Sequence, residues 1–219
     1  MSDPKPFDPG CRRCPRLVDF LEENRRRHPG YHCAPVDSFG DPDACFLIVG
    51  LAPGLHGANA TGRPFTGDHA GILLYETLHL HGWGSAPVSR SADDDLELRG
   101  CRITNAVRCV PPGNKPVGEE ERNCAPFLAW ELERLPEGGV ILALGQVAHR
   151  AVLRVLGEKQ KRYPFGHGRV HRLEGGKHLV DSYHCSRYNT QTRRLTPAMF
   201  HAVFEQVAVL LEEAAPAGR

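Results

Sequence analysis

The feature that most constrains the fold is an irregular, glycine-rich segment that directly follows a buried strand pattern. Residues 45–49 read Cys-Phe-Leu-Ile-Val, a continuous apolar run that is typical of a strand covered on both faces. The next nineteen residues, 50–68, contain five glycines and two prolines. Long regular structure is excluded there, because glycine permits positive φ and proline fixes φ. Loops at the carboxyl ends of strands bind ligands in open α/β sheets, so we interpret residues 50–68 as a ligand-binding loop.

Four side chains in this loop are suited to binding or chemistry. They are an amide (Asn59), a guanidinium (Arg63), an aromatic ring (Phe65) and a carboxylate (Asp68). A purely structural connection is the simpler alternative, but loops of this length without regular structure are usually functional or disordered. The apolar start and the regular placing of glycine and proline argue against disorder, which leaves function as the favoured interpretation.

The rest of the chain alternates strand patterns with helical ones. Strands are predicted at 101–107, 140–144 and 178–182, the last forming a hairpin with 169–173. Helices are predicted over 15–27, 69–81, 119–135, 146–156 and from 196–197 to about 213, with a break or kink near Pro126. The polar residues 84–97 are expected to form an exposed excursion. Alternating strands and helices predict one doubly wound α/β domain over residues 1–219.

Composition narrows the class of protein. The 219 residues carry a formal net charge of +1, so any nucleic-acid surface has to be a local patch. No apolar run approaches the length of a membrane span, and the first residues lack the apolar stretch of a signal peptide. We therefore expect a soluble, cytoplasmic protein that acts as a monomer.

Four of the eight cysteines form two pairs with metal-ligand spacing. Cys11 and Cys14 form C-x2-C, and Cys109 and Cys124 flank a loop rich in proline and glycine. Four thiolates can hold a tetrahedral zinc ion or an iron–sulfur cluster, and spacing alone does not separate the two. A redox motif or a chance spacing is the alternative for the first pair taken alone.

Three unusual loops follow strands and are expected to meet at one edge of a parallel sheet. They are residues 50–68, 105–116 and 183–195. The third combines His184 and Tyr188 with amides and arginines, a mixture that suits contact with nucleic acid. His184 alone would more simply be a satisfied loop histidine, but its place beside two other unusual loops favours a functional role.

These three loops and the four cysteines together resemble the uracil-DNA glycosylase superfamily. The similarity is greatest to its iron–sulfur-containing type B group, also called family 5, and covers about residues 8 to 210. The matching segments are 50–68, Thr104–Asn114 and His184–Thr196. No single segment is specific, but the combination is.

The resemblance implies a fold, a cofactor and a reaction. The fold is a three-layer α/β/α sandwich around a four-stranded parallel sheet, and the cofactor is a structural [4Fe–4S] cluster held by the four paired cysteines. The reaction is excision of uracil from DNA by hydrolysis of the N-glycosidic bond, after the base has been flipped into a pocket. Phe65 matches the ring that stacks on the base, Asn105 the amide that reads its edge, and Gly54 is assigned to the same substrate site. His184 matches the residue at the uracil carbonyl that gains negative charge.

One departure concerns the catalytic water. Related families place an acidic or amide side chain where this chain has Leu51 and Ala52, which agrees with the type B group. Asn59 is then our preferred residue for positioning water, and Asp68 a less favoured general base. The departure also suggests a less selective pocket, which would admit deaminated purines such as hypoxanthine and xanthine.

The third loop is expected to enter the DNA duplex. The candidates for insertion or DNA contact in this loop are Arg187, Tyr188, Asn189, Gln191, Arg193 and Arg194, and Arg63 is assigned to DNA binding as well. Alternatively, residues 185–195 simply cap the last helix. The competing functions for the whole chain are a non-enzymatic iron–sulfur or zinc protein that binds DNA or transfers electrons and, less favoured, a nucleotide-binding enzyme.

Overall fold

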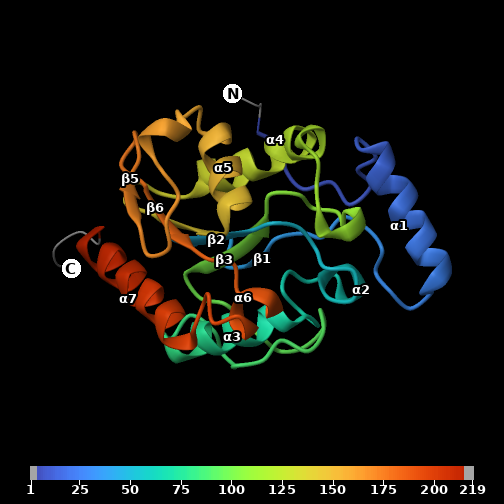
Figure 1. Ribbon diagram of the computed structural model, residues 1–219, viewed down its shortest axis with the longest axis horizontal. Helices are drawn as coiled ribbons and strands as arrows, with labels where there is room; N and C mark the ends of the chain where they lie inside the picture. Colours follow the sequence, from blue (N-terminus) through green and yellow to red (C-terminus); the bar gives the residue numbers. More distant parts are fainter. Residues whose placement is uncertain (1–3, 215–219) are drawn as a thin grey trace.

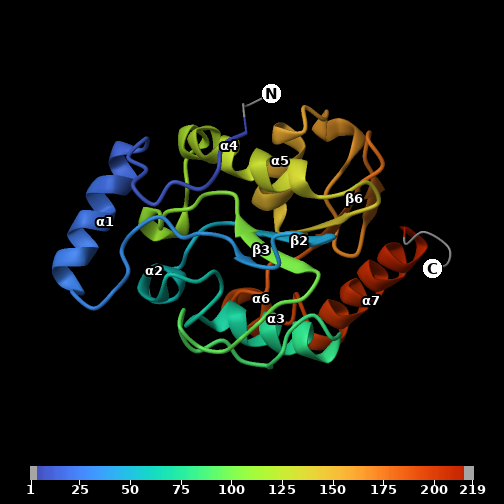
Figure 2. The same cartoon turned by 180° about the vertical axis from the view of Figure 1, so that it is seen from behind.

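A computed structural model describes residues 4–214 and centres on one mixed sheet of six strands (Figures 1 and 2). The strand order is β1-β3-β2-β4-β6-β5. The strands are β1 (Phe39–Gly40), β2 (Phe46–Gly50), β3 (Cys101–Asn105), β4 (Val140–Leu144), β5 (Val170–Arg172) and β6 (His178–Ser182).

The expected four-stranded sheet describes only the centre of the observed one. Strands β3, β2, β4 and β6 are parallel neighbours, with Phe46 opposite both Cys101 and Val140. Strands β1 and β5 add one antiparallel edge on each side. The sequence could not indicate β1, because two residues carry no periodicity.

Helices cover both faces of this sheet, as Figure 1 shows. The helices are α1 (Pro15–Arg27), α2 (Ala58–Thr61), α3 (His69–Leu80), α4 (Gly118–Arg134), α5 (Gln146–Val155), α6 (Arg187–Gln191) and α7 (Pro197–Ala214), with short 3-10 turns at Pro112–Asn114 and Gln160–Arg162. Strand β2 alternates between the two layers. Phe46 and Ile48 pack with α3 and α7, whereas Leu47 and Val49 pack with α4 and α5.

Two sequence predictions about local structure need correction. Helix α4 continues through Pro126, so it does not break there, because its apolar face, which includes Leu128 and Leu132, is buried against the sheet. That packing outweighs the roughly 3 kcal/mol cost of an internal proline. Strand β3 ends at Asn105 and not at 107, so the loop that follows begins at the edge of the sheet.

The N-terminal segment closes one end of the molecule. Helix α1 lies beside the loop that carries α2 in both views, and Lys5 N–H donates to the Pro126 carbonyl of α4 at 2.9 Å. Within residues 4–214, no helix combines the length and apolar character needed to cross a membrane.

Candidate active site

The carboxyl ends of the four parallel strands surround a cavity of about 550 Å³. Each strand end contributes to its wall, as expected for a switch point in an open α/β sheet. The residues that line it are Leu51, Ala52, Gly54, Ala58, Phe65, Asp68, His69, Ala70, Asn105, Asn114, Leu144, Gly145, Gln146, Val147, His184, Ser186, Arg187 and Tyr188. The three loops singled out in the sequence therefore meet in one place.

Phe65 forms an apolar wall of the cavity in a conformation that its neighbours enforce. Its φ is +55°, a left-handed value that is uncommon for a large side chain, and the ring is buried. Two glycines make room for it. A Cβ on Gly50 would lie 2.7 Å from the Phe65 ring, and one on Gly71 would lie 1.7 Å from the Phe65 carbonyl oxygen. The surrounding fold thus fixes this ring before any ligand arrives.

Asn105 presents an amide that the protein itself does not satisfy. It is the last residue of β3, its side chain is buried, and its Oδ1 has no hydrogen-bond partner among the described residues. Unpaired buried polar atoms are rare, because each costs about 1–3 kcal/mol. An unpaired amide in a cavity wall is therefore suited to reading the edge of a bound base.

His184 faces Phe65 across the cavity. The two rings are nearly parallel, with centroids 5.9 Å apart. The imidazole forms no hydrogen bond within residues 4–214, and burial lowers the pKa of His184 to about 4. At neutral pH the ring is therefore uncharged and can donate one hydrogen bond.

Asn59, the predicted water-positioning residue, does not line the cavity. It is fully buried on α2, and its Nδ2 donates long hydrogen bonds to Leu55 O (3.4 Å) and Cys33 Sγ (3.5 Å). The neighbouring Ala58 lines the cavity instead. The sequence assignment of Asn59 to catalysis is therefore not supported by its position.

Two other polar residues, Asp68 and Asn114, line the cavity, whereas Asn59 does not. Asp68 begins α3, where its Oδ1 accepts from Gly71 N–H at 2.9 Å. Burial raises the pKa of the Asp68 carboxyl, against the opposing effect of the hydrogen bonds from Gly71 and Ala70. Asp68 and the exposed amide Asn114 both line the cavity, which therefore has two groups that can hold a water molecule.

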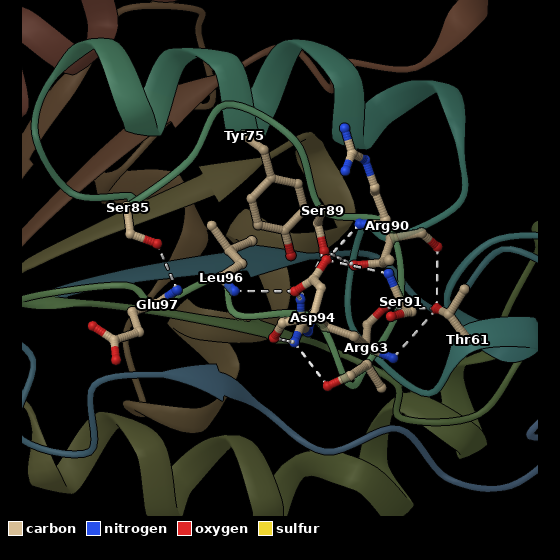
Figure 3. Close-up of polar contacts among 12 residues, drawn as sticks. Thr61, Arg63, Tyr75, Ser85, Ser89, Arg90, Ser91, Asp94, Leu96 and Glu97 are labelled. Carbon is tan, nitrogen blue, oxygen red and sulfur yellow. Dashed lines mark hydrogen bonds and ion pairs between the residues drawn. The ribbon is translucent and has the colours of Figure 1, made fainter.

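Arg63 was predicted to bind DNA, but its guanidinium is already engaged inside the protein. It pairs with Asp94 and donates to Ser89 Oγ (3.0 Å) and Ala92 O (2.8 Å). Figure 3 shows Arg63, Asp94 and Ser89 turned toward one another. Only 5 % of Arg63 is exposed, so the assignment to DNA binding is wrong.

The third loop is far more exposed than the first. Helix α6 begins after Ser186, and Tyr188 is 70 % exposed at the rim of the cavity. Asn189 belongs to the scaffold, since its Nδ2 donates to the His184 carbonyl at 2.8 Å. The other candidates in this loop, Arg187, Gln191, Arg193 and Arg194, are exposed.

The four paired cysteines come together at a distance from the cavity floor. Cys14, Cys109 and Cys124 lie in one buried cluster between α1 and α4, and Cys11 packs against it. All four are free thiols, and Asn123 Nδ2 lies 3.5 Å from Cys14 Sγ. Burial raises the pKa of the Cys124 thiol to about 11. Within residues 4–214, no three of these sulfur atoms lie mutually within 4.8 Å.

A buried group that the sequence did not reveal is formed by His149, His171 and Asp181. His149 Nδ1 lies 2.7 Å from Asp181 Oδ1, and its Nε2 lies 2.9 Å from the Tyr163 carbonyl. His171 Nε2 lies 3.3 Å from Asp181 Oδ2. Both nitrogens of His149 face oxygen acceptors, so neither offers a free lone pair to a metal ion. This group ties β5 and the segment after α5 to the sheet.

Comparison with known proteins shows which family this chain belongs to. The model of the uracil DNA glycosylase superfamily matches residues 38–208, which include all three loops. The chain therefore belongs to the uracil-DNA glycosylase superfamily. Its relatives place it within the type-5 group. A type-5 uracil-DNA glycosylase of Thermus thermophilus is 52 % identical over 195 residues, covering 87 % of this chain and 89 % of the relative.

Other relatives agree with this placement. A type-5 uracil-DNA glycosylase of Mycobacterium leprae is 45 % identical over 208 residues, covering 91 % of each chain. A type-4 uracil-DNA glycosylase of Pyrobaculum aerophilum is 33 % identical over 133 residues, covering 60 % of each. The similarity to the type-5 relatives thus extends over far more of the chain.

Proposed function

We propose that this protein excises uracil from DNA by hydrolysing the N-glycosidic bond and leaves an abasic site. One observation carries the proposal. The cavity at the sheet edge combines a fixed aromatic ring (Phe65), an unsatisfied amide (Asn105) and an uncharged imidazole (His184), in a chain whose relatives are named uracil-DNA glycosylases. A stacked base inside a duplex cannot reach such a cavity, so the target nucleotide has to be flipped out.

In this proposal, the first loop and β3 recognise the base. Phe65 stacks on the uracil ring, and Asn105 bonds to its amide edge, where the orphaned Oδ1 would gain a partner. Gly54 lines the same cavity, where its lack of a side chain lets backbone approach the base. Recognition by pre-positioned groups needs little reorganisation on binding.

His184 acts on the departing base. Cleavage moves negative charge onto the uracil carbonyl oxygen, and a donor aimed at that oxygen stabilises the transition state. A neutral imidazole can donate one N–H to it while keeping its proton. Removing a donor of this kind typically lowers the rate by about 10²-fold or more.

Asp68, with Asn114, holds the attacking water. The raised pKa of Asp68 makes its carboxylate a better proton acceptor than an ordinary aspartate, while its hydrogen bond to Gly71 keeps the carboxylate in place. Asn114 supplies an amide on the same cavity wall. This assignment replaces Asn59, which lies behind the wall.

The four paired cysteines fit an iron–sulfur cluster. A single zinc ion with Zn–S bonds of about 2.3 Å would draw four sulfurs to within about 3.8 Å of one another. Among the described residues no three of these sulfurs lie mutually within 4.8 Å, a spread that suits a [4Fe–4S] cluster, which the four thiolates would hold. A cluster held there would join α1 to α4 and to the loop after β3, and its loss would loosen one side of the active site.

The proposal extends to other deaminated bases, because nothing acidic or amidic stands at Leu51 or Ala52 to restrict the cavity mouth. We expect hypoxanthine and xanthine to be slower substrates than uracil. All three bases present an N–H and a C=O that Asn105 can pair, but uracil is the smallest of the three and fits the cavity with the least crowding.

The test is a screen of the purified protein against duplexes carrying uracil, hypoxanthine or xanthine. Free base and alkali-labile sites should appear in equal amounts with the uracil duplex. DNA binding without base release would favour the non-enzymatic alternative. Iron and acid-labile sulfide are measured on the same sample, and colourless protein with stoichiometric zinc would overturn the cluster assignment without touching the glycosylase assignment.

A further inference from the structure

A second groove of about 510 Å³ adjoins the proposed active cavity and has no role in the mechanism above. It runs between α3 and the segment 87–89. Four residues line both spaces, namely Phe65, Asp68, His69 and Arg187. The two spaces therefore share part of their walls, and whatever fills one lies close to what fills the other.

The walls of the second groove are apolar and unusually exposed. Ile72 on α3 is 65 % exposed and Val88 opposite is 52 % exposed, and Pro87 lies beside Val88. Large apolar side chains that face solvent around a concave surface commonly mark a binding site. A narrow space between two such aliphatic walls suits a flat ligand with apolar faces, such as a nucleobase.

Charge is distributed along the groove in a way that suits a nucleotide. Arg187 and His69 line the junction with the active cavity together with the Asp68 carboxylate, so Arg187 supplies the positive charge that a phosphate passing there would meet. Glu76 lies in the groove beyond the junction and would repel a phosphate there. A nucleotide whose base lies beside α3 and whose phosphate lies at the junction would contact Arg187 and keep its phosphate away from Glu76.

The wall that carries Val88 is fixed in advance. Ser89, the next residue, lies within hydrogen-bond distance of Thr66 Oγ1 (2.7 Å) and accepts from Arg63 at 3.0 Å. Asp94 accepts from the backbone N–H groups of Arg90 (2.6 Å) and Leu96 (3.2 Å), as Figure 3 shows. The expected exposed excursion is thus anchored to the first loop, and the groove is preformed.

We propose that this second groove binds the base of the nucleotide directly adjacent to the flipped uracil on the same strand. The inference rests on the proposed excision of uracil. The nucleotide bonded to the flipped one is the part of the substrate that the shared wall brings nearest to the groove. A bound neighbour would hold the strand while the target base enters the active cavity.

The test uses single-stranded oligonucleotides with one central uracil. In matched versions, the base on its 5′ side or its 3′ side is removed by substituting a tetrahydrofuran abasic unit. Single-turnover excision is measured against enzyme concentration to obtain the maximal rate and the half-saturating concentration. Removing the neighbour on one side should raise the half-saturating concentration about fivefold, because burying a few tens of Å² of apolar surface contributes roughly that much.

The double variant Ile72→Ser/Val88→Ser tests whether the groove is responsible. Both residues are exposed, so the fold should tolerate the changes. The variant should bind the complete oligonucleotide more weakly and should lose its sensitivity to the missing neighbour. Leu80→Ser is the matched control, because Leu80 is 66 % exposed on the same helix and lines neither space.

Two results would overturn the inference: parent protein that is indifferent to both neighbours, or a double variant that keeps the full sensitivity of the parent. Absence of uracil release both from every oligonucleotide and from a uracil-containing duplex would instead reject the proposed function itself. The two failures are therefore distinguishable.

Discussion

The first and third loops face one another across the same cavity but are built in opposite ways. In the first, residues 50–68, Phe65 and Arg63 are almost completely buried. In the third, residues 183–195, Tyr188 is 70 % exposed and Arg187 faces solvent. The hydrogen bonds of the two loops differ in the same way. Tyr75 OH donates to Pro64 O beside Phe65 at 2.7 Å, whereas the bonds within α6 are local to the loop.

This contrast indicates a division of labour. Groups that read the base and act on it have to be in place before the base arrives, so a buried loop suits them. Groups that enter the duplex have to lie in solvent until DNA binds, so an exposed loop suits them. On this account, chemistry belongs to the first loop, to β3 and to His184 at the start of the third loop, and base extrusion belongs to the exposed remainder of the third loop.

The largest expected effect comes from Asp68→Asn in the first loop. Asparagine caps a helix as well as aspartate does, so stability should change little. The single-turnover rate should fall by about 10²-fold or more, because the proton acceptor is lost, while DNA affinity is kept. Parent activity should also decline with falling pH above the usual aspartate range, because the raised pKa makes Asp68 bind its proton earlier.

The comparison variant for this prediction is Asn59→Ala, which removes a buried amide that lies outside the cavity. It should alter thermal stability more than the rate measured on folded protein. A rate lost in Asn59→Ala and kept in Asp68→Asn would restore the original assignment of the water-positioning residue to Asn59.

A large loss of stability is expected from Arg63→Gln. The change takes the buried guanidinium away from Asp94, Ser89 and Ala92, while the partly exposed Asp94 keeps its backbone partners, and such a loss typically costs about 1–3 kcal/mol in unfolding free energy. Denaturant titration should show this loss, with the salt dependence of DNA binding unchanged. Arg154→Gln is the matched control. It breaks the more exposed pair with Glu121 and should cost less than about 1 kcal/mol.

Tyr188→Ala in the third loop should produce a smaller and more selective effect. Extruding a base from a duplex costs a few kcal/mol, and an inserted ring offsets part of that cost. Excision of uracil from a paired duplex should slow by about tenfold, whereas excision from a single strand should barely change. Tyr188→Phe keeps the ring and should resemble the parent.

Replacing Arg193 and Arg194 by alanine should weaken binding to every DNA to a similar degree. Both side chains are exposed at the end of the third loop. If each neutralises one phosphate, the slope of log affinity against log salt should decrease by about 0.9 for each arginine removed. An unchanged slope would show that neither side chain meets the backbone.

The smallest expected effect concerns His184, whose contribution to the rate should not depend on pH near neutrality. His184 has a pKa of about 4, below its ordinary value, so its ring stays neutral between pH 6 and 8. The ratio of parent rate to His184→Ala rate should therefore be constant across that range and should fall only as the pH approaches 4. An inflection near pH 6.5 in this ratio would show that a protonated ring acts in the reaction.

Much of the fold could be predicted from the sequence because it depends on local patterns. Apolar periodicity placed α3, α5 and α7 within a residue or two of their observed bounds, and the pattern at 45–49 located β2. The edge strand β1 left no such pattern. That residues 1–219 form one domain stays a prediction, and residues 1–3 and 215–219 lie outside the described part.

Topology alone places a site residue where that residue stands at the end of a strand. Asn105 ends β3 and His184 follows β6, so both are carried to the sheet edge. Asn59 and Arg63 lie within a loop, where direction depends on distant partners. The partner of Arg63 is Asp94, 31 positions later, and nothing in the local sequence pairs the two.

The most direct test of the division of labour compares two substrates across four proteins. Single-turnover excision is measured on a uracil-containing duplex and on the same strand alone. The four proteins are the parent, Asp68→Asn, Tyr188→Ala and the variant that combines Asp68→Asn with Tyr188→Ala. The ratio of the duplex rate to the single-strand rate should fall about tenfold whenever Tyr188 is replaced, and Asp68→Asn should leave it unchanged. A ratio that moves with Asp68→Asn, or a Tyr188→Ala variant that slows both substrates equally, would contradict the account.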